Sequence, residues 1–102
     1  MKWHKKLYYG TSILQPQWAK FQINFGKKSK GYYCIALSNG SENLLDIYES
    51  QFLRTTHLNM DDVYIIGIAG SKSEAYDVVR DIIEDVYLKT RGYDIKNFLA
   101  IE

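Results

Sequence analysis

Residues 67–73, Gly-Ile-Ala-Gly-Ser-Lys-Ser, are the stretch in which residue types and spacing come nearest to a site for chemistry. They follow an apolar run and precede a helical pattern, which is where phosphate-binding loops lie. A nucleotide P-loop needs a glycine directly before its lysine and another five residues earlier, but Ser71 and Ile66 stand at those positions. We therefore expect Ser71 to cap a helix, and we keep open that Ser71 and Lys72 bind an anion at the helix N-terminus.

The other side chains with catalytic or metal-binding potential lack partners at useful spacing. The acidic residues of segment 72–91 lie opposite an apolar stripe, which is typical of a solvated helix face. His4 and His57 have no metal-ligand companions nearby in the sequence. Cys34 lies within a strand pattern, where we expect a buried and inert thiol. The sequence predicts no catalytic, cofactor or metal site, and a protein that is not an enzyme.

The charges divide the chain into a basic and an acidic region. Residues 1–41 contain seven Lys and no Asp or Glu, whereas residues 42–102 contain six basic and twelve acidic residues. The net charge of +1 therefore conceals a region of +7 and a region of −6. Such asymmetry predicts an anion-binding face, head-to-tail association between copies, or attraction between the two regions of one fold.

Lysines and aromatic residues lie close together in the basic region. Lys20 lies near Trp18, and Lys27, Lys28 and Lys30 form a basic turn. Lysines can bind phosphates, and aromatic rings can stack on bases. The glycine-interleaved aromatic signature of RNA-recognition sheets is absent, however. Nucleic-acid binding through these residues is therefore an alternative hypothesis rather than the leading one.

Length and composition indicate one folded domain, residues 1–102, in which residues 1–41 are the basic region and residues 42–102 the acidic region. A hydrophobic content of 46% and a single proline argue against disorder. The lone cysteine excludes an intrachain disulfide and fits a reducing compartment. The sequence has neither the apolar core of a signal peptide nor a run of about 20 apolar residues that would span a membrane. We expect a cytoplasmic protein without a membrane segment.

The basic region has the pattern of a β-rich segment. Segments 6–13, 18–25 and 32–37 predict three strands, with a hairpin turn at 26–31. In the second of these strands one face is apolar and consists of Ala19, Phe21, Ile23 and Phe25. Strands that follow one another along the chain commonly pair, which predicts an antiparallel meander.

The acidic region has the pattern of alternating helix and strand. Segment 42–54 has apolar residues at helical spacing and predicts a first helix. The apolar run 63–69 predicts a buried strand, and 72–91 predicts a long amphipathic helix. Asp94 is expected to cap a last helical turn. A helix between two strands predicts that those strands are parallel.

These elements predict an α+β fold, a two-layer β-β-β-α-β-α arrangement with a mixed four-stranded sheet and two helices. If both helices cover one sheet face, the other face stays open and carries Trp18 with Tyr32 or Tyr33. We expect this aromatic face to bind a second copy or another protein, which makes the chain a protein-interaction or regulatory module and a homo-oligomer. The alternatives are nucleic-acid binding, and a small enzyme or anion binder at the turn 70–72.

One resemblance rests on the second half of the chain. Residues 63–71, followed by Glu74, Ala75 and the helical segment 79–87, are similar to the C-terminal half of small uncharacterised bacterial proteins. Those proteins share an apolar strand, Gly-x-Ala, Glu-Ala, a long helix and a closing glycine. The resemblance covers half of the chain. It implies the strand–helix fold of this half and a bacterial source, and it implies no activity.

Overall fold

A computed structural model describes residues 2–25, 31–37, 44–52 and 63–101 of the chain. These residues form four strands, three α-helices and one 3₁₀ turn. In chain order the elements are β1 (Lys2–Tyr9), α1 (Pro16–Phe25), β2 (Tyr33–Leu37), β3 (Leu45–Glu49), η1 (Ser50–Phe52), β4 (Tyr64–Ala69), α2 (Lys72–Thr90) and α3 (Ile95–Ile101).

The four strands form one mixed sheet in the order β1-β4-β2-β3. Strand β1 runs parallel to β4, whereas β2 runs antiparallel to both of its neighbours, β3 and β4. The predicted α+β class and the mixed four-stranded sheet are thus confirmed. The parallel pair is a different one, because the sequence predicted that β2 and β4 would be parallel and that β1 would belong to a meander.

Strand β4 is buried on both of its faces. Ile65 and Ile68 belong to one apolar cluster, and Ile66 and Ala69 belong to another on the opposite side of the sheet. All four side chains have no exposed surface. A strand with two apolar faces needs a cover on each side, because either face left in water would forfeit its hydrophobic stabilisation.

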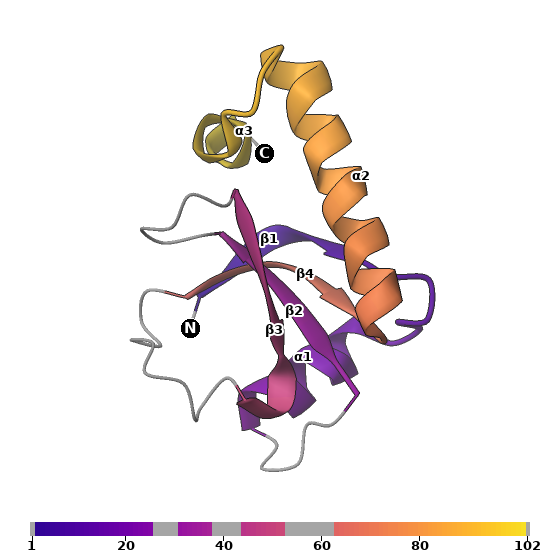
Figure 1. The fold of residues 1–102 in the computed structure, drawn as a ribbon. Coiled ribbons are helices and arrows are strands. Elements are labelled where there is room, and N and C mark those ends of the chain that lie inside the picture. The colour runs from indigo at the N-terminus through magenta and orange to yellow at the C-terminus, as the bar shows by residue number, and fades with distance from the viewer. Residues whose placement is uncertain (1, 26–30, 38–43, 53–62, 102) are drawn as a thin grey trace.

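The helices supply both covers (Figure 1). On one side α2 and α3 lie over the sheet and bury Ala75, Val78, Ile82, Val86, Ile95, Phe98 and Leu99 against it. On the other side lies α1, whose Ala19 and Ile23 pack with Cys34 and Ala36 of β2 and with Ile65 and Ile68 of β4. The sheet therefore lies between two helical layers, and the open aromatic sheet face that the sequence predicted is not formed.

Residues 18–25, predicted as a strand, belong to helix α1. The side chains of Ala19 and Ile23 are buried, whereas Phe21 between them is half exposed. This pattern fits the period of a helix, because residues four apart share a helix face, and it does not fit the period of two expected of a strand. Pro16 is the first residue of the helix, where proline is well tolerated because the missing N–H has no partner in any case.

Residues 45–49, predicted as part of a helix spanning 42–54, form strand β3. This strand pairs with β2 in a regular antiparallel register, from Tyr33 opposite Glu49 to Leu37 opposite Leu45. Its apolar residues alternate between the two clusters, with Ile47 on the α2 side and Tyr48 on the α1 side. Residues 18–25 form a helix instead of a strand, and residues 45–49 form a strand instead of part of a helix. The number of strands is therefore the same as predicted.

Helices α2 and α3 match the predictions from the acidic region. Helix α2 begins after Ser71 and runs to Thr90, and the backbone N–H of Asn97 binds the Asp94 carboxylate at the start of α3. The residue that ends α2 is Arg91, which has a left-handed backbone conformation with a φ of 59°. Within the described ranges, no helix is long and apolar enough to cross a membrane.

The role of α1 as a cover can be tested with two substitutions on that helix. Ile23→Ala should lower the free energy of unfolding by about 2–5 kcal/mol because it opens a cavity in the core. Phe21→Ala should change it by less than about 0.5 kcal/mol because that ring is half exposed. Urea unfolding at a concentration where both variants are monomeric measures the difference. An equal loss of unfolding free energy in the two variants would contradict the assignment of these residues to a helix, since a strand would bury both side chains on one face.

Candidate functional site

The predicted turn at Ser71 and Lys72 is a helix N-cap. The Ser71 hydroxyl accepts a hydrogen bond from the Glu74 backbone N–H at 3.1 Å, and the Ser71 carbonyl accepts one from the Ala75 N–H at 2.9 Å. Both Ser71 and Lys72 are exposed. The hydroxyl half of the expected capping box is thereby confirmed.

The Glu74 carboxylate does not bind Ser71 in return but joins two turns of the chain. It accepts hydrogen bonds from the Gly70 N–H at 2.9 Å, the Ser12 hydroxyl at 2.8 Å and the Ser12 N–H at 3.3 Å. A Cβ atom at Gly10 would collide with the Glu74 carboxylate, and one at Gly70 would collide with the Ser12 hydroxyl. A side chain at either position would displace the Glu74 carboxylate or the Ser12 hydroxyl, so the two glycines leave space for these hydrogen bonds.

This junction lies where α/β proteins commonly bind ligands. Strands β1 and β4 are parallel neighbours, and the chain leaves β1 for α1 on one face and β4 for α2 on the other. Such a change of direction opens a crevice at the carboxyl ends of the strands. In this chain Glu74 fills that position with its own negative charge. An external anion would have to compete with this carboxylate for the Gly70 and Ser12 donors, which disfavours the predicted anion site.

A different surface, on the outside of α1, carries exposed apolar side chains. Leu14 just before the helix is 86% exposed, Trp18 is 54% exposed and Phe21 is 51% exposed. Trp18 and Phe21 are three residues apart on α1 and lie on the face away from the buried Ala19 and Ile23, and Leu14 precedes the first turn of the helix. The rings of Trp18 and Phe21 stack at 5.6 Å between centroids with 14° between their planes. We call Leu14, Trp18 and Phe21 the α1 ridge.

The α1 ridge stands on a helix that is fixed on both flanks. On one flank the Trp3 indole N–H of β1 donates to the Asn24 side-chain oxygen at 3.1 Å. On the other flank the Tyr32 hydroxyl donates to the Gln22 side-chain oxygen at 2.5 Å. These bonds and the buried inner face hold the exposed rings in place, so the ridge is a preorganised surface.

A hollow and the side chain of Lys20 lie next to the α1 ridge. The hollow has a volume of about 260 Å³ and is lined by Ser12, Ile13, Leu14, Gln15, Trp18, Ala19 and Tyr32. The Lys20 ammonium lies 5.3 Å from the centroid of the Trp3 ring, a cation–π arrangement. Lys20 is the one charged residue of α1.

The structure brings together two of the three residues that the sequence grouped into one interface. Trp18 and Tyr32 line the same hollow beside α1. Tyr33 packs instead with the cluster beneath α2, on the other side of the sheet. Of the predicted phosphate contacts, Lys20 lies on α1, and Lys27, Lys28 and Lys30 lie outside the described residues.

Sequence reasoning missed Leu14 and Phe21 as exposed partners of Trp18. The signal was present, because positions 14, 18 and 21 follow a helical period and Pro16 marks a helix start. It was missed because residues 18–25 also alternate, and that alternation was interpreted as a strand.

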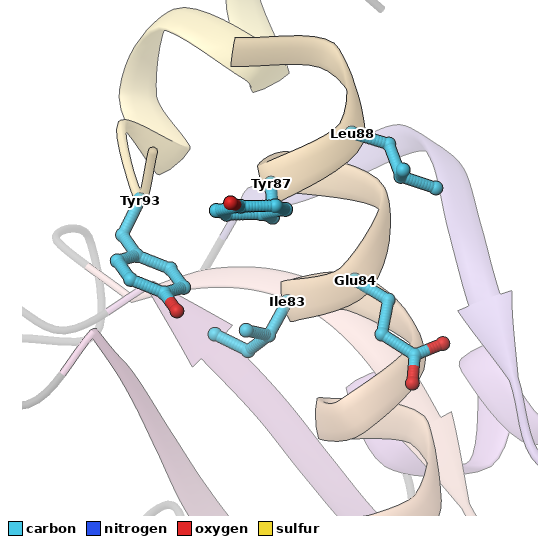
Figure 2. A pocket seen from close by; sticks show the side chains of 5 residues that line it. All are labelled: Ile83, Glu84, Tyr87, Leu88 and Tyr93. Atoms are coloured by element: carbon cyan, nitrogen blue, oxygen red, sulfur yellow. The ribbon is translucent and has the colours of Figure 1, made fainter. Parts of the chain in front are cut away.

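A second exposed apolar surface lies on the C-terminal half of α2 and the connection that leads to α3 (Figure 2). Ile83, Glu84, Tyr87, Leu88 and Tyr93 line a hollow of about 470 Å³. Figure 2 shows Tyr93 pointing back toward Ile83 and Tyr87, while Glu84 and Leu88 project from the other flank of α2. The Tyr87 and Tyr93 ring centroids are 5.9 Å apart. We call these five residues the α2–α3 groove.

Two further side chains that could take part in a reaction, Cys34 and His4, are buried in the fold. Burial raises the pKa of the Cys34 thiol to about 12, which keeps it protonated and unreactive at neutral pH. His4 is buried on β1, and its Nδ1 lies 2.7 Å from the Tyr64 hydroxyl. Among the residues that the structure describes, no group of three His, Cys, Asp or Glu side chains is placed to hold a metal ion.

Comparison of the chain with protein-family models, with curated proteins and with solved structures gives no match. The functional argument therefore rests on the geometry of the α1 ridge, the α2–α3 groove and the Glu74 junction.

Removal of the Glu74 charge should weaken the junction between the two turns. Glu74→Gln should lower the free energy of unfolding at pH 7 by about 1–3 kcal/mol, because charge-assisted hydrogen bonds to Gly70 and Ser12 are weakened. Asp81→Asn, on the exposed face of the same helix and outside any proposed contact, is the control and should change little because its ion pair with Arg80 is at the surface. Chemical unfolding of the three proteins at several pH values measures both effects.

The pH dependence of the Glu74 effect has a defined sign. Burial acts to raise the pKa of Glu74, but hydrogen bonds from Gly70 and Ser12 outweigh it and place the pKa below its ordinary value of 4.5. The stabilisation is therefore fully present above pH 4.5 and is lost as the pH falls through the lower folded-state pKa. The difference between wild type and Glu74→Gln should shrink over that acid range, and a difference that grew there would contradict the assignment.

Proposed function

We propose that the protein is a protein-interaction module that associates with further copies of itself through the α1 ridge. The observation that carries this proposal is the exposure of Trp18 and Phe21 on the outer face of a helix whose inner face is buried, with the exposed Leu14 just before its first turn. Single exposed apolar residues are common, but a group of large ones beside a hollow is typical of a contact surface. Helices that dock into grooves use anchors at the i, i+3 spacing of Trp18 and Phe21.

The chemistry of the α1 ridge suits protein contact. Tryptophan dominates the energetics of many interfaces, because a large ring buries much surface at a low cost in conformational entropy. Trp18 is already stacked on Phe21, so binding would order little further. The lone cysteine, Cys34, suits a reducing compartment, which supports the cytoplasm as the place of this function.

Self-association is favoured over nucleic-acid binding by the stacking of Phe21 on the Trp18 ring. A nucleic-acid surface would instead leave such rings free to stack on bases. The distribution of charge along the chain also favours association between copies, since the region that includes the ridge is basic and the remainder is acidic.

The oligomeric state tests the proposal. Size-exclusion chromatography with light scattering over a range of concentrations should show wild type above the monomer mass. Trp18→Ala should weaken association at least tenfold, as expected for a central aromatic anchor. Leu44→Ala is the matched control, because Leu44 is another exposed apolar residue but lies beside β3 and away from α1, and it should have no effect.

Two outcomes would contradict self-association through the α1 ridge. One is a wild type that remains monomeric at all concentrations, and the other is an oligomer that Trp18→Ala leaves intact. Retardation of an oligonucleotide in a gel, lost in Trp18→Ala and weakened steeply by salt, would support the nucleic-acid alternative instead.

A further inference from the structure

The two exposed apolar surfaces lie on opposite sides of the sheet. The α1 ridge is on the helix that covers one face, and the α2–α3 groove is on the helices that cover the other (Figures 1 and 2). They cannot meet within one chain, because the sheet separates them. A contact between ridge and groove therefore requires two copies.

The charges of the two surfaces are opposite. Lys20 is the charged residue of α1, and residues 1–41 contain no carboxylate side chain at all. The outer face of α2 carries the exposed acids Asp77, Asp81 and Glu84, whereas Asp85 accepts a hydrogen bond from the Tyr8 hydroxyl of β1. Arg80 lies 3.7 Å from Asp77 and 4.0 Å from Asp81, so one cation faces these two acids, and Glu84 contributes its charge directly to the groove.

We infer that the α1 ridge of one copy docks into the α2–α3 groove of a second copy, head to tail. This inference rests on the proposed function and names the surface that the ridge contacts. In this contact Lys20 of one copy approaches Glu84 of the other, and apolar side chains of the ridge and of the groove are buried against each other. A ridge-to-ridge contact would instead bring together two surfaces that carry lysine and no acid, which opposes association.

The dimensions of the two surfaces are compatible. Trp18 and Phe21 are about 5 Å apart along the axis of α1, and Leu14 lies before its first turn. The groove has a volume of about 470 Å³, within the range of about 300–1,000 Å³ typical of pockets that take up bound groups. Its walls are Tyr87, Leu88 and Tyr93, all large and exposed, which offer ring edges and an aliphatic side chain to an entering indole such as Trp18.

A head-to-tail contact has a consequence that a two-fold symmetric contact lacks. Each copy uses its ridge on one neighbour and its groove on another, so the assembly either closes into a ring or extends as a chain. A copy with a damaged ridge still has an intact groove, and a copy with a damaged groove still has an intact ridge. Two such variants can therefore associate with each other but not with themselves.

Mixing two single-surface variants tests the inference. Phe21→Asp damages the ridge and Leu88→Asp damages the groove, and both sites are at least half exposed, so the fold should tolerate them. Each variant alone should associate at least tenfold more weakly than wild type, while an equimolar mixture should give a complex of two chains by light scattering. If either variant fails to fold, the milder pair Trp18→Ala and Tyr93→Ala takes its place.

Charge reversal gives an independent readout at the same contact. Lys20→Glu alone and Glu84→Lys alone should each weaken association about tenfold, and the chain with both changes should regain most of it at low salt. Unchanged association in all three proteins would overturn the pairing of these two side chains.

The outcomes separate this inference from the proposed function. If Phe21→Asp abolishes assembly but Leu88→Asp has no effect, the ridge binds another surface, so the inference fails and the proposed function stands. If the mixed variants remain monomeric although wild type assembles, the contact is not head to tail. If wild type is monomeric at every concentration, both fail.

Discussion

The burial of β4 on both faces is the constraint on which the rest of the structure depends. Ile65 and Ile68 face α1, and Ile66 and Ala69 face α2 and α3. Two-sided burial requires two covers, and the chain supplies both by leaving its parallel strands β1 and β4 on opposite sides of the sheet. The completed core therefore leaves neither face of β4 open to a partner. The exposed rings of Trp18 and Phe21 lie instead on the outside of α1.

Close contact at the carboxyl ends of β1 and β4 holds this arrangement together. Glu74 of α2 accepts hydrogen bonds from Gly70 after β4 and from Ser12 after β1, and Gly10 leaves the space for its carboxylate. A position that binds ligands in many α/β folds is thus used by this chain for its own side chain. The hydrogen bonds from Gly70 and Ser12 both join the two turns and favour the charged form of Glu74. They therefore also lower its pKa.

Prediction from the sequence was correct for segments whose apolar residues fit only the period of a strand or only the period of a helix. It was wrong for segments whose apolar residues fit both periods. Segment 63–69 is too short and too rich in β-branched residues for a helix, and α2 is too long and too regular for a strand. In 18–25, however, Ala19 and Ile23 fit both a strand face and a helix face, and only Phe21 distinguishes the two. Segment 45–49 is similarly ambiguous, and pairing with β2 decides it. Short amphipathic segments take their structure from tertiary contacts, which the local sequence does not contain.

The same ambiguity decided how much of the candidate site could be predicted. Trp18 was correctly expected at the surface, but as part of a sheet face with Tyr32 and Tyr33 rather than of a helix ridge with Leu14 and Phe21. From the sequence, one sheet face was expected to stay open and to bind a second copy or another protein. The cover of that face is α1, and recognising it as a helix shifts the expected contact surface to the outside of that helix.

Native-state hydrogen exchange of the β4 amides tests the account most directly, because it reports what covers this strand. If α1 is the cover, the amides of Ile65 and Ile68 should exchange only through global unfolding, and their protection should not change when the protein is diluted to the monomer. The amides within α1 should be protected as well. Loss of β4 protection on dilution, with α1 exchanging freely at all concentrations, would mean that another copy supplies the cover and would contradict the account.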